Sequence, residues 1–188
     1  MLIDLREIPE AHRGEEKDTF ELFAREFLEA IGLSCVAGPD RGPDGGRDLL
    51  VEENRIGPLG TSTIRWLVSC KHKAHSDSSV GANDEEDPIG RMDAHRASGF
   101  ICFYSTIPSS SLATKLSIVT DRKRELSVFD RGRIAKYFVE DDRLAGVLES
   151  YLPESASRLA ESPSRAAHAK LRDDHRDFLQ RIAENLDA

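Results

Sequence analysis

The segment GPDGGRDLL, residues 42–50, combines a glycine-rich turn with the start of an apolar strand. It contains two aspartates. Asp44 lies inside the turn, where aspartate is common because its side chain hydrogen-bonds to nearby backbone groups. Asp48 lies where the predicted strand begins, and the turn gives no reason for an acid there. Asp48 is therefore the stronger candidate for chemistry.

A lysine at the end of a later strand is the second candidate. In WLVSCK, residues 66–71, alternate side chains point to opposite faces, so Ser69 and Lys71 share one face and Cys70 lies on the other. A lysine in an otherwise apolar strand costs free energy unless it has an acidic partner or a task. Antiparallel pairing of the two strands would bring Asp48 close to Lys71 on one side of the sheet, and we predict that these two residues work together.

The elements that must position this pair follow from periodicity and from turn residues. Phe20, Phe23, Phe27 and Ile31 recur at helical spacing. A long loop is indicated by the Gly, Pro, Ser and Thr of residues 54–63. The resulting order of helices and strands predicts an α/β fold with a mixed central sheet flanked by helices. Helices are predicted at 16–31, 85–97, 108–124 and 141–152, and strands at 33–37, 48–53, 64–72, 99–106 and 126–130.

The composition changes near residue 153. Residues 153–164 are rich in Ser, Pro, Glu and Ala, which is typical of a linker, and residues 165–186 form a polar helical pattern with a narrow apolar stripe. We therefore predict a domain at 1–152 and a linker with a C-terminal helical extension at 153–188. That helix would pack on the domain or on another subunit.

Taken together, these motifs resemble the PD-(D/E)xK nucleases, and most closely the Mrr-type restriction endonucleases. The resemblance is carried by Phe20, Glu21 and Gly32 on and after the first helix, by GGRDLL, by Cys70 and Lys71, and by GFICFYSTIPSS at 99–110. It covers roughly residues 16–150. It implies a restriction-endonuclease-like fold and a nuclease that acts on DNA in defence against foreign DNA.

The resemblance also implies a site. Glu21, Asp48, Ser69 and Lys71 would form the catalytic set, and Asp48, Glu21 and the backbone carbonyl of Cys70 would hold Mg²⁺ or Mn²⁺. Such an ion binds the scissile phosphate and lowers the pKa of an attacking water. Ser69 is a departure, since the family normally has Glu or Gln at that position and a hydroxyl is a weaker ligand for Mg²⁺.

Further residues are candidates for contact with nucleic acid. Lys73 and His75 lie in the polar segment after the strand, and Arg91 and His95 are one helical turn apart. Solvated surface positions are an equally good interpretation of Arg91 and His95. A zinc site at Cys70 and the neighbouring histidines is not favoured, because His72 and Lys71 point to opposite faces and no second Cys/His pair follows at a suitable spacing.

The composition limits the function classes. Hydrophobic residues make up 39% and charged residues 32% of 188 residues, and the net charge of −8 argues against a general nucleic-acid coat protein. No apolar run approaches the roughly 20 residues of a membrane helix, and the N-terminus shows no signal-peptide pattern. Three widely spaced cysteines predict reduced, buried thiols and a cytoplasmic protein.

Two functions are compatible with these residues. The first is a metal-dependent DNA endonuclease, as a homodimer or switched on by a partner protein. The second is a catalytically inactive nuclease-fold module that binds nucleic acid or a protein. The residues Asp48, Lys71 and Glu21 favour the first, whereas Ser69 and the acidic net charge favour the second.

Overall fold

One mixed sheet forms the centre of the molecule. The computed structural model describes residues 2–11, 18–38, 48–163, 177 and 182. Within these residues five strands lie in the order β1-β2-β3-β4-β5, with antiparallel pairing among the first three and parallel pairing from β3 to β5. The mixed sheet predicted from sequence is confirmed. The strands are β1 (Ser34–Ala37), β2 (Leu49–Gly57), β3 (Gly60–Lys71), β4 (Gly99–Tyr104) and β5 (Glu125–Phe129).

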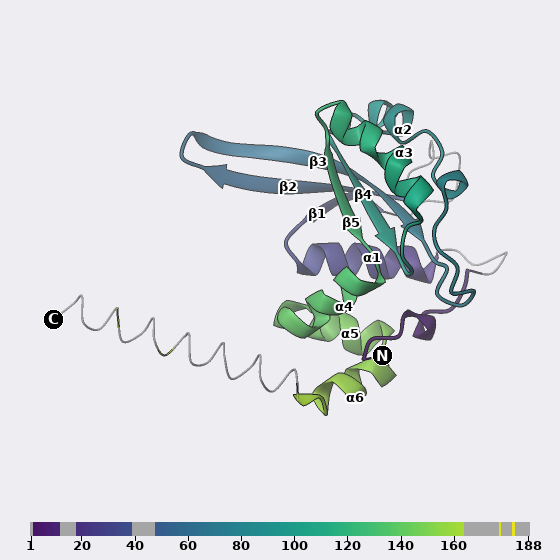
Figure 1. The fold of residues 1–188 in the computed structure, drawn as a ribbon. Helices are drawn as coiled ribbons and strands as arrows, with labels where there is room; N and C mark the ends of the chain where they lie inside the picture. The colour runs from purple at the N-terminus through teal and green to yellow at the C-terminus, as the bar shows by residue number, and fades with distance from the viewer. Residues whose placement is uncertain (1, 12–17, 39–47, 164–176, 178–181, 183–188) are drawn as a thin grey trace.

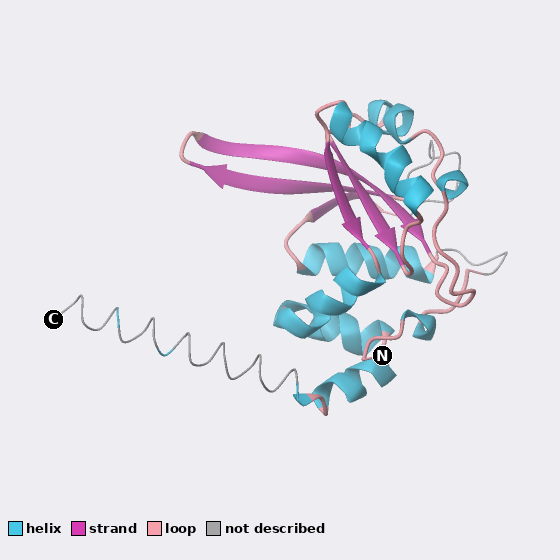
Figure 2. Cartoon of the chain, in the orientation of Figure 1, coloured by secondary structure: helices cyan, strands magenta, loops and turns pink. Residues whose placement is uncertain are grey.

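Helices cover both faces of this sheet (Figures 1 and 2). On one face lie α1 (Thr19–Ala30), α4 (Arg131–Glu140), α5 (Ala145–Tyr151) and α6 (Pro153–Ala160), and on the other lie α2 (Pro88–Ala94) and α3 (Ser110–Asp121). Three short 3-10 turns are η1 (Leu5–Glu7), η2 (Ala82–Asp84) and η3 (Asp142–Leu144). The result is a three-layer arrangement in which β4 and residues 66–70 of β3 are buried on both faces.

Helix α1 anchors the larger core. Its N-cap Asp18 accepts a hydrogen bond from the backbone N–H of Phe20, and Gly32 follows its end with a φ of +110°, a conformation that glycine adopts without strain. The predicted stripe of Phe20, Phe23 and Phe27 is buried, and all three rings pack against Phe103 of β4. The helix predicted at 16–31 is thus confirmed as α1, and its apolar face packs in the larger core.

The long loop predicted at 54–63 is wrong. Strands β2 and β3 continue through this segment as a hairpin, with Asn54 opposite Thr63 and Gly57 opposite Gly60 around a turn at Pro58 and Leu59. The hairpin projects beyond the layers of helices (Figure 1). Because no described helix covers it, its strand residues have the polar composition of a loop. Ile56 and Leu59 near its tip are 89% and 103% exposed.

The linker expected at 153–164 is also different in the structure. Residues 153–160 form α6, which starts with Pro153 at its first position and buries Leu159 in the larger core. The carboxylate of Glu7 fixes this helix, because it accepts hydrogen bonds from the backbone N–H of Ser155 and from Arg158 Nη2, both at 2.9 Å. Residues up to 160 therefore pack as part of the domain. The helix predicted at 165–186 lies almost entirely outside the described residues.

The cysteines agree with the expectation of reduced thiols. All three are free; Cys70 and Cys102 are buried, while Cys35 is half-buried at the sheet edge. In the part of the chain that the structure describes, no helix has the length and apolarity needed to cross a bilayer.

The role of α6 can be tested by truncating its buried side chain. We expect Leu159→Ala to lower the free energy of unfolding by about 2–4 kcal/mol, because it removes a fully buried leucine and leaves a cavity. Ser157→Ala, on the exposed side of the same helix, should change it by less than about 0.5 kcal/mol. Urea unfolding followed by circular dichroism measures both. Equal effects of the two substitutions would mean that α6 does not belong to the folded domain.

Candidate active site at the ends of strands β2 and β3

The structure brings Asp48 and Lys71 together. Leu49 pairs with Val68, so the position of Asp48 lies beside Ser69 at the end of the β2–β3 ladder. One carboxylate oxygen of Asp48 accepts a hydrogen bond from the backbone N–H of Cys70 at 2.5 Å and lies 3.9 Å from Nζ of Lys71. The predicted proximity of the two side chains is therefore present. Asp44, within residues 39–47, lies outside the described residues.

Burial dominates the electrostatics of Asp48. Its side chain is 19% exposed, and removal from water raises the pKa of its carboxyl above the ordinary 3.8. The charge of Lys71 and the hydrogen bond from Cys70 act in the opposite direction but do not outweigh burial. The fold thus keeps a carboxylate at the sheet end at a cost in stability, which is a pattern found at functional sites.

Ser69 lies opposite Asp48 across the β2–β3 ladder and on the same face as Lys71. It is fully buried, and its hydroxyl oxygen has no hydrogen-bond partner among the described residues. Buried hydroxyls are normally hydrogen-bonded, so this oxygen remains available to a group near Asp48.

Glu21 lies in the first turn of α1. Its charge and that of Asp48 both add to the effect of burial, which raises the pKa of the Cys70 thiol well above its ordinary value. The carboxylate of Glu21 is therefore near the end of β3. The Cys70 thiol stays protonated at neutral pH, so it does not serve as a nucleophile or a thiolate ligand.

Lys73 is held by partners within the chain. Its Nζ lies 2.6 Å from Oδ2 of Asp84, and its backbone N–H donates to Oγ of Ser105 at 2.6 Å. The hydrogen bond from Lys73 is the main cause that lowers the pKa of Asp84, and the charge of Lys71 lowers it further. Lys71 thus lies near a second acid, and Lys73 is 28% exposed, which leaves it accessible from solvent.

The two histidines near the site contact the N-terminal segment. His72 and His75 each place Nε2 within 2.9 Å of the backbone carbonyl of Ile8, to which a protonated Nε2 donates. His72 also stacks on Phe20, and burial lowers the pKa of its ring. His72 lies on the face opposite Lys71, as predicted. The contact of His75 with Ile8 gives it a structural role, and its contact with nucleic acid stays a prediction.

Arg91 and His95 belong to α2 and its C-terminal end. Arg91 is only 14% exposed, and its Nη1 donates to the fully buried carboxylate of Glu85 at 3.0 Å. His95 follows as the C-cap and is half-buried. The ion pair directs Arg91 inward, so a solvated position does not describe it, and its proposed contact with phosphate would require this pair to open.

Sequence reasoning missed the residues that surround the pair. Asp84, Glu85, Tyr104 and Lys115 were not candidates, although all of them take part in hydrogen bonds on the Lys71 side of the sheet. Glu85 and Glu86 are neighbours of the same type, yet Glu85 is fully buried and Glu86 is exposed. Only the tertiary partners distinguish them.

Comparison with known proteins decides the family. A family model of the Mrr catalytic domain, described as a restriction endonuclease, matches residues 13–138, which is more than half of the chain. The chain belongs to the Mrr-type restriction endonuclease family. A search of curated proteins found no match.

A comparison with solved structures found two restriction endonucleases, one of which reaches a TM-score of 0.50 with this Mrr-type domain. The DNA modification-dependent restriction endonuclease AspBHI has a TM-score of 0.50 at 15% identity, over 75% of this chain and 33% of that one. The MspJI restriction endonuclease in complex with a 27-mer oligonucleotide has a TM-score of 0.47 at 19% identity, over 74% and 32%. The chain thus spans about a third of the length of either protein. The family match and the likeness to AspBHI confirm the predicted restriction-endonuclease-like fold.

The donor set of this Mrr-type domain fits a magnesium ion that keeps some of its own water. Among the described residues no group of three or more His, Cys, Asp or Glu side chains is arranged to hold a metal. Mg²⁺ nevertheless binds commonly through one or two carboxylates, with waters and substrate phosphates as its other ligands. A desolvated carboxylate at Asp48 agrees with that mode, and so does the hydroxyl of Ser69, which has no hydrogen-bond partner among the described residues.

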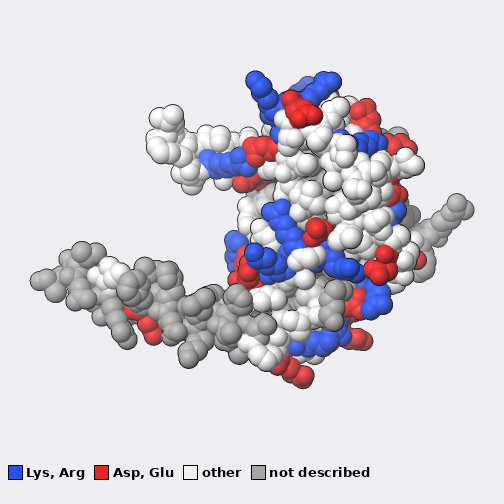
Figure 3. Space-filling view, viewed as in Figure 1, with Lys and Arg blue, Asp and Glu red and all other residues white. Residues whose placement is uncertain are grey.

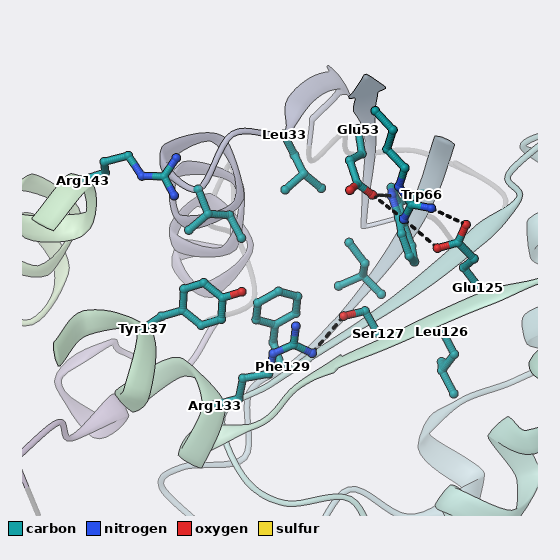
Figure 4. A pocket seen from close by; sticks show the side chains of 13 residues that line it. Leu33, Glu53, Trp66, Glu125, Leu126, Ser127, Phe129, Arg133, Tyr137 and Arg143 are labelled. Carbon is teal, nitrogen blue, oxygen red and sulfur yellow. Dashed lines mark hydrogen bonds and ion pairs between the residues drawn. The ribbon is translucent and has the colours of Figure 1, made fainter. Parts of the chain in front are cut away.

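A cavity lies elsewhere in the part of the molecule that the structure describes. It has a volume of about 440 Å³ and lies on the α1 and α4 side of the sheet, between Trp66, Phe129 and Tyr137. Figure 4 shows Arg133 over Phe129 and hydrogen-bonded to Ser127 there, with the aliphatic and aromatic walls around it. Neither Asp48 nor Lys71 lines this cavity. The size of this cavity does not make it the active site, because the candidate pair lies outside its lining.

The raised pKa of Asp48 predicts how stability depends on pH. The folded chain binds the Asp48 proton more tightly than the unfolded chain, so stability falls as pH rises from about 3.8 through the folded pKa. We expect Asp48→Asn to have a larger free energy of unfolding than the parent at pH 7. The difference should shrink as the pH decreases through the folded pKa.

Asp84 supplies a control of opposite sign. Its pKa is lowered, so its ionised form contributes stability that is lost as the pH falls through the folded pKa. Asp84→Asn should therefore be less stable than the parent at pH 7, with the loss shrinking at low pH. Urea unfolding at several pH values measures both variants. An Asp48→Asn variant that is less stable at pH 7 would show that Lys71 and Cys70 outweigh burial.

Proposed function

We propose that this chain is the catalytic part of a Mg²⁺- or Mn²⁺-dependent endonuclease that hydrolyses phosphodiester bonds in DNA and acts in defence against foreign DNA. The observation that carries the proposal is the contact between Asp48 and Lys71, 3.9 Å apart where β2 begins and β3 ends, in a member of the restriction endonuclease family. A carboxylate and an ammonium group side by side can bind a cation and a phosphate together.

In this proposal Asp48 holds the cation, with the backbone carbonyl of Cys70 and the hydroxyl of Ser69 as neutral ligands and Glu21 near the same strand end. When bound, the cation would lower the pKa of a water molecule and polarise the scissile phosphate. Asp48 is held in place for this task by the N–H of Cys70, which leaves its second oxygen free of that hydrogen bond.

Lys71 has the charge and the position to act on the substrate. Its side chain is 27% exposed, so Nζ can reach a phosphate while its stem stays among buried strand residues. An ammonium group that is already fixed near the developing negative charge stabilises the transition state without further reorganisation. Lys71 would also orient the attacking water.

The charges on one face of the molecule agree with local rather than extended contact between that face and a DNA backbone. On the face shown in Figure 3, Lys and Arg side chains alternate with Asp and Glu, and the β2–β3 hairpin is mostly uncharged. Lys73, next to the site, is accessible from solvent and pairs with Asp84. We propose Lys73, with His75, Arg91 and His95, as residues that contact DNA near the cleavage position.

One observation favours an inactive nuclease-fold module that binds nucleic acid or a partner protein. Ser69 occupies a position where similar nucleases carry an acid or an amide, so the strand supplies a weaker hydroxyl ligand there. The alternative predicts binding without cleavage, and the same assay separates the two functions.

The first test is cleavage of plasmid DNA. We expect nicking or linearisation by the purified chain with Mg²⁺ or Mn²⁺, and a loss of roughly a hundredfold or more in rate for Asp48→Ala and for Lys71→Ala. Lys136→Ala is the matched control, because Lys136 also lies 3.9 Å from an acid, Glu140, but is exposed on α4. Unchanged cleavage by folded Asp48→Ala or Lys71→Ala would refute the site.

The second test concerns the metal ion. Removing divalent ions with a chelator should abolish cleavage, and adding Mn²⁺ in excess should restore it, because the protein donors alone do not activate water. Gel electrophoresis of the plasmid measures both steps, and circular dichroism shows whether the chelator alters the fold. Cleavage that persists with chelator would exclude a metal-dependent reaction, whereas DNA binding without cleavage under every condition would favour the alternative.

A further inference from the structure

A small cavity opens beside the proposed site, at the carboxyl ends of the parallel strands. It has a volume of about 130 Å³, and its walls include the side chains of Arg6, Asp77, Ser105 and Arg131. Ser105 directly follows β4, and Arg131 is the first residue of α4, just after β5. A cavity of this volume has room for a phosphate group, and its two arginines have no task in the site described above.

Ser105 connects this cavity to Lys71. Its backbone N–H donates to the carbonyl oxygen of Lys71 at 3.1 Å, and its hydroxyl accepts a hydrogen bond from the backbone N–H of Lys73 at 2.6 Å. Strand β4 lies between β3 and β5, and neighbouring strands are about 4.8 Å apart, so β3 and β5 are roughly 10 Å apart. A DNA backbone bound at Lys71 can therefore extend to the cavity.

Both arginines of the cavity are paired with aspartates, but in different ways. Arg6 donates to the carboxylate of Asp4 through Nε at 2.9 Å and Nη2 at 2.7 Å. Asp4 is the N-cap of η1 and also accepts a hydrogen bond from the backbone N–H of Arg6, so this pair is part of the turn. Arg131 instead donates through Nη1 to Asp77 at 2.9 Å, and the side chain of Asp77 is 74% exposed.

Asp77 is a partner that another anion can replace. An ion pair with an exposed carboxylate contributes little stability, so opening it costs little free energy. The hydrogen bonds to Asp4 raise the pKa of Arg6, and the charge of Asp77 raises it further, so the Asp77 carboxylate acts on both arginines. A guanidinium group binds carboxylate and phosphate oxygens with the same fork of N–H donors. A phosphate can therefore take the place of the Asp77 carboxylate.

We propose that Arg6 and Arg131 form a phosphate-binding site that holds the DNA backbone beside the cleavage position, and that the carboxylate of Asp77 occupies this site until DNA displaces it. The inference rests on the proposed function and adds two substrate-binding residues to it. Phosphate contacts fix the register of a duplex but carry no base information, so the effect is the same for every DNA sequence.

The inference predicts opposite effects of the arginines and the aspartate on DNA affinity. We expect Arg6→Gln and Arg131→Gln each to weaken binding by about tenfold, because each removes a charge-assisted hydrogen bond to phosphate. Each should also reduce the slope of log affinity against log salt concentration by about one, since one counterion fewer is released. Asp77→Asn should tighten binding by about threefold, because it removes the competing carboxylate, and asparagine tolerates the positive φ of this position.

Matched controls separate these effects from a general change in charge. Arg143→Gln is the control for Arg6, because Arg143 also pairs with an N-cap aspartate and is similarly exposed, but lies beyond the C-terminal end of α1. Asp93→Asn is the control for Asp77, since Asp93 is an exposed acid that pairs with Arg124, just before β5 begins and thus at the opposite end of that strand. Both controls should keep the affinity and the slope of the parent.

The experiment is a titration of a short, fluorescently labelled DNA duplex with the full chain at several NaCl concentrations, followed by fluorescence anisotropy. A chelator is present, so that cleavage does not change the duplex. If the parent cleaves plasmid DNA but binds the duplex only with a divalent ion, the same variants are compared by the KM of plasmid cleavage at each NaCl concentration. Circular dichroism establishes that each variant is folded.

The outcomes separate this inference from the proposed function. Where the parent binds or cleaves DNA, an unchanged affinity and slope in either folded arginine variant overturn the inference alone. The same follows if Asp77→Asn binds no more tightly than Asp93→Asn, and this comparison decides if an arginine variant does not fold. A parent chain that neither binds the duplex nor cleaves plasmid DNA overturns the proposed function, and this inference with it.

Discussion

The half-buried carboxylate of Asp48 is the constraint on which the arrangement of the site depends. Removal from water destabilises its charged form, and the hydrogen bond from Cys70 and the charge of Lys71 only partly compensate. The sheet must therefore bring the Cys70 N–H and the Lys71 ammonium group to Asp48 at one point, where β2 begins and β3 ends. The side chains packed around these strands hold them in register.

The register is set by the two cores. Phe20, Phe23 and Phe27 of α1 pack on one face of β3 and β4, and α2 and α3 pack on the other. A slip of one residue would move the apolar side chains of β3 to the wrong faces and would carry Lys71 away from Asp48. The free-energy cost of shifting a buried strand thus fixes the register of β2 and β3. The same register brings Asp48 and Lys71 together.

Sequence alone was sufficient where a local period decided the structure. The alternation in WLVSCK placed Lys71 and Ser69 on one face, and the phenylalanine spacing located α1, because both depend on repeats within a single element. The sequence was insufficient where the structure of a segment depends on contacts with residues far away along the chain. The exposed hairpin has a loop-like composition because no described helix covers it, and α6 depends on Glu7 at the other end of the chain. Glu85 is buried only because Arg91 and Tyr104 surround it.

The projecting hairpin gives β3 two different environments along one strand. Its last residues lie in a five-stranded sheet with helices on both faces, whereas its first residues pair only with β2 and face solvent. Two-stranded ribbons are marginally stable by themselves, and local opening follows the least protected hydrogen bonds. Amide hydrogens near Thr61 should therefore exchange with solvent rapidly while those near Val68 exchange only on global unfolding. A single continuous strand thus spans the range from local fraying to the most protected part of the fold, and the site lies at its protected end.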